Sequence, residues 1–197
     1  MTMAPPSSPT SASTLTPRAS RDVFLLIILC LALFGIGLNF PPLANPDEAR
    51  YAEIPREMLA TNDFVTPRLD GIKYFEKPPL TYWLVAGSIK IFGPGEGAAR
   101  ATPAILAALG VLLTYGAGRS LAGRDAGWWA AVVQATALLY FAHARILLTD
   151  MVVSVLICAT LYCFLLAVRE PPGRKRRLLF YGLYASAALA TLAKGLI

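Results

Sequence analysis

Long apolar blocks alternate with short polar segments along the 197-residue chain. The blocks cover residues 23–40, 98–121, 126–142, 146–168 and 178–197. A helix of about 20 apolar residues crosses the roughly 30 Å hydrocarbon core of a bilayer. Because lipid offers the backbone no hydrogen-bond partners, such blocks favour helices, which satisfy their own backbone groups. The pattern therefore predicts an all-α, polytopic transmembrane helical bundle.

The composition agrees with a membrane protein. Hydrophobic residues make up 56% of the chain and charged residues 15%, whereas soluble domains contain about 25% charged residues. The net charge of +6 is best explained by cytoplasmic loops, because the sequence holds no nucleic-acid-binding motif. Cys30, Cys158 and Cys163 all lie in apolar blocks, so we expect small buried side chains there and neither a disulfide framework nor a metal site.

The N-terminal segment differs from the rest of the chain. Residues 1–20 are rich in Ser, Thr and Pro and contain no acidic residue, which predicts a disordered cytoplasmic tail. The block at 23–40 exceeds the roughly 7–15 apolar residues of a signal-peptide core, and no small-residue cleavage site follows it. We therefore expect a retained first span, with residues 21–197 forming one incomplete transmembrane domain.

The distribution of basic residues indicates the orientation of the spans. The strongest basic segment covers residues 169–178, and positive loops stay in the cytoplasm. The short apolar block at 80–92 contains Lys90. If that block is an interfacial helix and not a span, the N-terminus and the basic segment both lie inside. Residues 41–97 then form a large outer loop.

The outer loop opens with the sequence "NPDEARYAEI", which begins like a helix. Asn45 is a favoured N-cap, and Pro46 suits the first helical position. Tyr51, Ile54 and Met58 recur at spacings of three and four residues, so they lie on one helical face. These features predict a short amphipathic helix along the membrane surface.

Two features of this helix invite further interpretation. Pro55 lies inside the pattern and is expected to kink or end the helix, because it removes a backbone hydrogen bond. Asp47 can pair with Arg50 three residues later, as in any capped surface helix. Asp47 is also the carboxylate nearest to the first span, and a carboxylate close to hydrocarbon needs partners or a function. The residues alone leave both readings open.

A second polar cluster, "KYFEKPPL", supplies Tyr74, Glu76 and Lys77. The double proline that follows disfavours a helix at Lys77 and holds this segment extended. The cluster is either an aromatic and cationic interfacial anchor or a rigid presentation of an acid and a cation at a cleft. Asp150, near the predicted outer end of a span, is likewise either interfacial or functional.

Four motifs together resemble a known family. "DEARYAEI", "YFEKPPLTYWL", "TDM" and "LAKG" are similar to motifs of the polyprenyl-phosphate-sugar glycosyltransferases of the GT-C fold. The greatest likeness is to the bacterial lipid A aminoarabinose transferases, relatives of the protein O-mannosyltransferases, and it covers Leu38 to the C-terminus. The resemblance implies surface helices placed over a cavity that a lipid-linked donor enters from the side.

The resemblance also implies roles for individual residues, and it suggests a divalent metal ion as one hypothesis. The residues are Asp47 and Asp150 as catalytic acids, Arg50, Tyr51, Tyr74 and Lys77 as ligands of the donor phosphate, and Glu76 as a metal-associated residue. Cations aimed at the departing phosphate stabilise the negative charge that develops there. A hydroxyl acceptor needs a general base, which Asp47 can supply. A phosphate acceptor is already ionised, and Asp47 would then orient groups or stabilise the positive charge at the anomeric carbon.

The expected function is that of the N-terminal part of an integral membrane glycosyltransferase in the bacterial inner membrane. It would move 4-amino-4-deoxy-arabinose, or a hexose such as mannose, from a polyprenyl phosphate to a lipid A-type or protein acceptor on the outer face. The expected partners are this donor, the acceptor and membrane lipids, with no nucleic acid. Members of the family are much longer, so we expect little activity from 197 residues alone. The alternative is a non-enzymatic, truncated membrane protein or lipid-binding scaffold; a transporter is disfavoured because the chain has no internal repeat.

Overall fold

The computed structural model describes residues 17–40 and 42–195. The described chain is mostly helical. Helix α1, Pro17–Cys30, continues into the π-helical turn η1, Leu31–Gly35. The remaining helices are α2 Asp47–Thr61, α3 Leu80–Phe92, α4 Glu96–Ala122, α5 Arg124–Thr136, α6 Leu138–Arg145, α7 Thr149–Ala167 and α8 Arg174–Lys194. Strands β1, Arg68–Leu69, and β2, Ile72–Lys73, pair antiparallel, and this short hairpin is a departure from the all-α prediction.

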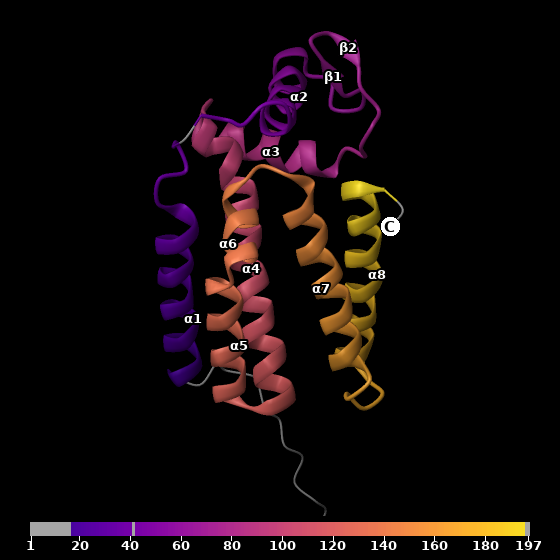
Figure 1. Cartoon of the computed structure of the whole chain (residues 1–197). Coiled ribbons are helices and arrows are strands. Elements are labelled where there is room, and N and C mark those ends of the chain that lie inside the picture. Colours follow the sequence, from indigo (N-terminus) through magenta and orange to yellow (C-terminus); the bar gives the residue numbers. More distant parts are fainter. Residues whose placement is uncertain (1–16, 41, 196–197) are drawn as a thin grey trace, which may run out of the picture.

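The helices form two layers. The helices α1, α4, α5, α6, α7 and α8 stand side by side as a bundle, and α2, α3 and the hairpin lie across one end of it (Figure 1). Along the chain α1, α4, α7 and α8 and the pair of α5 and α6 alternate in direction, with α6 continuing the course of α5. The predicted outer loop therefore covers one end, while the connections before α5 and before α8 lie together at the other end.

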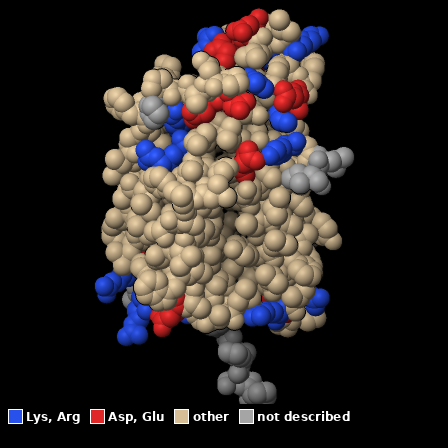
Figure 2. Space-filling view, in the orientation of Figure 1, with Lys and Arg blue, Asp and Glu red and all other residues tan. Residues whose placement is uncertain are grey.

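The surface of the bundle has the character expected of a membrane protein. In the face that Figure 2 presents, charged residues gather at the two ends and leave a largely uncharged band between them. Helices α4 and α7 are long and apolar enough to cross a membrane, by length and composition. Large apolar side chains such as Phe24, Trp129 and Leu161 are exposed. An extended exposed apolar surface marks contact with a membrane or another protein.

Two predicted spans are interrupted. The block at 126–142 was predicted as one span, but the helix breaks at Ala137, whose backbone is extended with φ −62° and ψ 125°. The Thr136 side chain beside this break donates to the Val132 carbonyl, 2.8 Å away. In the block at 23–40 the α-helix ends at Cys30 and the backbone becomes extended at Ile36. A hydropathy pattern averages over such single-residue breaks and does not reveal them.

Three local predictions were wrong. Residues 17–20, predicted as part of a disordered tail, begin α1, and residues 1–16 of that tail lie outside the described residues. Helix α2 has Pro46, not Asn45, as its N-cap and shows no side-chain cap bond. It also continues through Pro55 to Thr61. Pro55 is buried, as are Ile54 and Met58 on either side of it, and tertiary packing of a helical face can stabilise a helix against the loss of one backbone bond.

The apolar face predicted for α2 is confirmed. Tyr51, Ile54 and Met58 are buried in a cluster with Tyr82 of α3. Leu147, from the connection between α6 and α7, belongs to the same cluster. A second cluster fills the bundle, where residues of α1, α4 and α5 meet. The end layer is therefore packed onto the bundle, and this packing fixes the position of α2 over the bundle end.

Candidate functional site

The predicted polar residues of the outer loop meet in one cluster around Arg50. The Arg50 guanidinium donates to the Tyr74 hydroxyl at 2.8 Å and lies 3.4 Å from Glu76. It also approaches Asp47 at 3.6 Å. Tyr74 donates to Glu76, and the Lys77 ammonium lies 3.6 Å from the same carboxylate. Segments more than twenty residues apart thus place two cations, two carboxylates and a phenol together.

Local structure explains how these residues meet. Asp47 and Arg50 lie one turn apart on α2, on neighbouring positions of the helix surface. The hairpin turns the chain back, with Asp70 and Gly71 at φ 53° and 77°, and the Tyr74 amide then donates to the Pro67 carbonyl at 2.8 Å. Residues 75–77 are not helical, as the double proline predicted, but Glu76 and Lys77 lie in a bend and not in the extended segment that was expected. Helix α3 begins at residue 80.

The charges within the cluster compensate one another. The hydrogen bond from Tyr74, followed by the nearby charges of Lys77 and Arg50, lowers the pKa of Glu76 despite some desolvation. Desolvation and the Glu76 hydrogen bond raise the pKa of Tyr74. Glu76 is therefore an anion that already pairs with both Arg50 and Lys77. An anionic ligand that binds to Arg50 and Lys77 must compete with it.

Tyr51, a predicted phosphate ligand, has a different environment. Its side chain is 7% exposed, and its ring stacks on Tyr82 with centroids 6.2 Å apart. Burial is the main reason why the pKa of Tyr51 is raised, and Glu76 adds to this rise. Tyr51 therefore forms the buried floor behind the Arg50 cluster and is not one of its exposed members.

Asp150 is connected to the cluster through a lysine that the sequence analysis did not single out. Lys194 of α8 pairs with Asp150 at 2.5 Å. Lys194 also lines a cavity of about 360 Å³ together with Glu76 and Lys77. The sequence signal was present as the "LAKG" motif, but nothing in that motif assigned a role to its lysine. The cavity thus has two lysines and one carboxylate in its wall, a composition suited to an anion.

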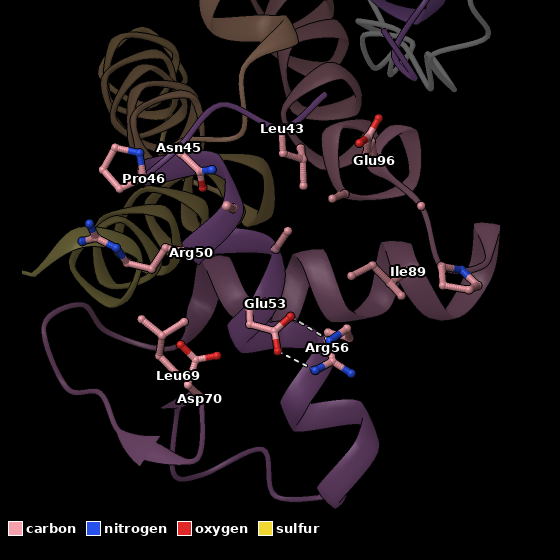
Figure 3. A pocket seen from close by; sticks show the side chains of 15 residues that line it. Leu43, Asn45, Pro46, Arg50, Glu53, Arg56, Leu69, Asp70, Ile89 and Glu96 are labelled. Carbon is pink, nitrogen blue, oxygen red and sulfur yellow. Dashed lines mark hydrogen bonds and ion pairs between the residues drawn. The ribbon is translucent and has the colours of Figure 1, made fainter. Parts of the chain in front are cut away.

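A larger cavity of about 770 Å³ lies between α2, the hairpin and the turn before α4. Figure 3 shows Arg50, Asp70 and Glu96 around it, with Glu53 and Arg56 joined by two hydrogen bonds of 2.7 and 2.5 Å. The sequence analysis did not anticipate this cavity. Arg50 lines it, whereas Tyr74, Glu76 and Lys77 do not.

The metal hypothesis for Glu76 stays a prediction. Within the described ranges, the carboxylates close enough together to share an ion are Glu53, Glu57 and Asp70, a group that excludes Glu76. Glu53 already accepts both Arg56 bonds, and Glu57 accepts the Gly71 amide at 3.2 Å. The surroundings of Glu76 contain cations and a phenol, which suit an anionic ligand better than a metal ion.

Glu48, next to Asp47, positions the start of α2. Its carboxylate accepts hydrogen bonds from the Ala44 amide at 2.9 Å and from the Leu147 amide at 2.8 Å. Leu147 precedes α7, the helix that carries Asp150. One buried side chain therefore connects the α2 site residues to the segment that leads to Asp150. In the sequence, Glu48 is only an acid in the first turn of the helix, and nothing local indicates these partners.

Comparisons with known proteins agree with this architecture. The sequence profile of the dolichyl-phosphate-mannose-protein mannosyltransferase family matches residues 19–197. An undecaprenyl phosphate-alpha-4-amino-4-deoxy-L-arabinose arabinosyl transferase 2 of Sodalis glossinidius is 33% identical over 174 residues, covering 88% of this chain and 32% of the relative. A second one, from Proteus mirabilis, is 30% identical and covers 93% of this chain and 34% of the relative.

A solved structure shows the same fold. ArnT from Cupriavidus metallidurans bound to undecaprenyl phosphate superposes with a TM-score of 0.83 at 32% identity, covering 90% of this chain and 33% of that protein. The apo form of ArnT gives a TM-score of 0.78. The chain spans about a third of the length of these relatives. The profile match and the shared fold show that the chain belongs to the dolichyl-phosphate-mannose-protein mannosyltransferase family.

Proposed function

We propose that this chain forms part of an integral membrane glycosyltransferase that takes a sugar from a polyprenyl-phosphate donor. The observation that carries the proposal is the pairing of Arg50 and Lys77 with Glu76, where Glu76 and Lys77 also line a small cavity. The matched structure that carries undecaprenyl phosphate supports this class of donor. The names of the relatives support 4-amino-4-deoxy-arabinose as the sugar and a lipid A-type acceptor; a protein acceptor is the alternative that the family name supports.

The residues suit the transfer step. The bond between the anomeric carbon and the phosphate oxygen breaks, and the electron pair leaves with the phosphate. Lys77, Lys194 and Arg50 are the cations that would stabilise this departing group. The acceptor oxygen attacks the anomeric carbon. If the acceptor is a hydroxyl, its proton passes to Asp47, whose exposed carboxylate is available as a base.

We propose the same membrane orientation as the sequence analysis predicts. The bundle crosses the bacterial inner membrane several times, and the layer at residues 41–97 lies on the outer face. The alternating directions of α1, α4, the α5–α6 pair, α7 and α8 in Figure 1 and the uncharged band in Figure 2 support this arrangement. The basic residues 174–177 at the opposite end then lie in the cytoplasm.

The test is transfer of radiolabelled sugar from a polyprenyl-phosphate donor by the complete gene product in lipid nanodiscs. Replacing the proposed base, Asp47→Asn, is expected to reduce the rate by about 100-fold or more. Lys77→Met is expected to reduce it by a similar factor, because it removes a cation from the departing phosphate.

Lys73→Met is the matched control for Lys77→Met. Lys73 lies in the same loop and is exposed, so its substitution should leave the rate unchanged. Wild-type rates in both Asp47→Asn and Lys77→Met would refute the assignment of roles. Absence of transfer by the unsubstituted protein with every polyprenyl-phosphate sugar would refute the proposed function itself.

A further inference from the structure

The start of α8 carries a dense group of cations that the proposed sugar-transfer site does not use. Residues 169–177 include the basic residues Arg169, Arg174, Lys175, Arg176 and Arg177 and the single acid Glu170. Lys175 pairs with this acid. No carboxylate in the described ranges lies within ion-pair distance of the three arginines at 174, 176 and 177. The first turn of α8 therefore presents three guanidinium groups without an acidic partner from the described chain.

This placement is unfavourable for the helix itself. The N-terminal end of a helix carries a partial positive charge, so cations there reduce its stability. Arg174 and Arg177 also lie one turn apart, where like charges repel each other. The preference for basic residues in cytoplasmic loops explains how many cations this connection holds, but cations anywhere in the connection would satisfy it. Their position in the first turn of α8 becomes favourable when an anion binds there.

A cavity of about 460 Å³ lies beside these arginines. Its wall consists of Pro172, Gly173, Arg176, Arg177 and Phe180, so it contains two guanidinium groups and no carboxylate. The Arg176 guanidinium lies over the Phe180 ring, 5.6 Å from the ring centroid, and this contact orients it. Two guanidinium groups at one cavity suit a phosphate group, because each can donate two parallel hydrogen bonds to phosphate oxygens.

The face of α8 that continues from the cavity suits a lipid. Tyr181 and Tyr184 follow Arg177 at spacings of four and three residues, so the three residues share one helical face. Tyr181 is 67% and Tyr184 is 68% exposed, and exposed tyrosines concentrate where lipid headgroups meet hydrocarbon. The connection between α7 and α8 lies at the end of the bundle opposite the layer of α2 and α3 (Figure 1). The cavity thus lies where a headgroup would be, at the start of a face that runs along the bundle.

We propose that this cavity binds the phosphate of an anionic phospholipid from the cytoplasmic leaflet, with Arg176 and Arg177 as its ligands. The acyl chains lie along the face of α8 that carries Tyr181 and Tyr184. A zwitterionic phospholipid binds more weakly, because its ammonium group adds a positive charge beside the arginines. The inference requires the proposed membrane orientation, but it concerns the end of the bundle opposite the sugar-transfer site and does not depend on transfer.

The test measures which lipids stay bound to the complete gene product. The protein is reconstituted in nanodiscs of equal parts phosphatidylglycerol and phosphatidylcholine, released, and analysed by native mass spectrometry. The unsubstituted protein should retain phosphatidylglycerol in preference to phosphatidylcholine. Arg177→Gln should reduce this preference by about fivefold, because each cation close to anionic lipid contributes an attraction of about that size.

Two further variants distinguish a defined site from a diffuse attraction between charges. Lys175→Gln removes the same charge from the same turn, but Lys175 pairs with Glu170 and lies outside the cavity wall, so the preference should change by less than about twofold. Phe180→Leu leaves every charge in place and removes the ring beneath Arg176, so the preference should fall by about two- to fivefold. Equal effects of Arg177→Gln and Lys175→Gln, with none from Phe180→Leu, would overturn the site.

Stability in lipid-free detergent is the folding control. Arg177→Gln removes a cation from the positive end of α8, so its thermal midpoint should equal or exceed that of the unsubstituted protein. A lower midpoint would contradict the unfavourable placement on which the inference rests. Phosphatidylglycerol should raise the midpoint of the unsubstituted protein, whereas inorganic phosphate at the same concentration should not. An equal rise with inorganic phosphate would show that the cavity binds the free anion and not a lipid.

The membrane orientation is checked separately, with a membrane-impermeant thiol reagent applied to intact cells that produce Pro171→Cys. Protection of this cysteine is expected, because residue 171 lies in the connection before α8. Labelling from outside would overturn the proposed orientation, and with it the cytoplasmic leaflet as the source of the lipid. Retention of both lipids in equal amounts by the unsubstituted protein would overturn the lipid site and leave the proposed sugar transfer untouched.

Discussion

Arg100 donates to both carboxylate oxygens of Glu48, at 2.9 and 2.7 Å, and both side chains are only 4% exposed. Arg100 lies near the start of α4, and Glu48 lies in the first turn of α2. The guanidinium also donates to the carbonyls of Leu38 and Pro42 at 3.0 and 3.2 Å. This ion pair therefore joins the bundle, the segment that leaves α1 and the helix that carries Asp47.

Breaking this pair should destabilise the protein strongly. Removing one partner leaves the other charge buried and uncompensated, which costs about 3–5 kcal/mol. We expect a large drop in the thermal midpoint of Arg100→Met, measured by unfolding in detergent. Arg56→Met is the matched control, because the Arg56 side chain is 60% exposed in its pair with Glu53 and surface pairs contribute about 0–1 kcal/mol. Equal midpoints in the two variants would contradict a stabilising role for the buried pair.

The same pair predicts a pH dependence of stability. Burial opposes ionisation of Glu48, but the hydrogen bonds from Arg100 and from the Ala44 and Leu147 amides outweigh it, so its pKa lies below the ordinary value of 4.5. The unfolded chain then binds more protons than the folded protein at acidic pH. The contribution of Glu48 is complete above the unfolded pKa and is lost as the pH falls through the folded pKa.

Glu48→Gln isolates this contribution from that of the other carboxylates. We expect the difference in unfolding free energy between the unsubstituted protein and Glu48→Gln to be constant near neutral pH and to shrink below about pH 4.5. The measurement is chemical unfolding in detergent over a series of acidic buffers. A difference that grows as the pH falls would mean that the pKa of Glu48 is raised and not lowered.

Helices α4 and α5 approach each other closely where two glycines meet. A Cβ atom added at Gly127 would lie 2.6 Å from the Arg119 amide nitrogen and 2.7 Å from the Tyr115 carbonyl oxygen, and backbone atoms cannot move aside cheaply. Gly127→Ala should therefore lower the unfolding free energy by about 1–3 kcal/mol. Gly116→Ala is the control: it lies in α4 with no atom within 4 Å of the added Cβ, so it should be neutral or stabilising, by up to about 1 kcal/mol.

How far the sequence predicts this structure depends on the range of the interactions involved. The apolar face of α2 and the non-helical segment before α3 follow from local spacing and from proline geometry, and both were correctly anticipated. The Asp70-Gly71 pair is a local signal for a tight hairpin that the sequence analysis did not use. Local rules overstated the effect of Pro55, because they do not include the burial of that residue in a packed face.

Ion pairs between residues distant in sequence could not be predicted from the sequence. Arg124 lies 102 residues from Asp22, and its guanidinium donates to both oxygens of that buried carboxylate at 2.7 and 2.6 Å. Arg100 and Glu48 are 52 residues apart. In the sequence each of these residues is an ordinary charge with nothing nearby that indicates its partner. Only the arrangement of helices decides which acid meets which base, so the partners of the candidate site residues could not be predicted either.

Lys194 offers the clearest test of the small cavity as a binding site for an anion. Its ammonium pairs with Asp150, and the two side chains are 37% and 40% exposed, so solvent screens this pair and its loss should affect stability by at most about 1 kcal/mol. Lys194→Met should nevertheless weaken undecaprenyl phosphate binding by about tenfold, because it removes a cation from the cavity that Lys77 also lines. Lys90→Met, on the exposed side of α3, should leave the affinity unchanged.

Asp150→Asn keeps Lys194 and removes its counter-ion, so the affinity for undecaprenyl phosphate should stay equal or increase. Weaker binding in Asp150→Asn would mean that Asp150 is needed to position Lys194, whereas unchanged binding in Lys194→Met would exclude this lysine from the phosphate site.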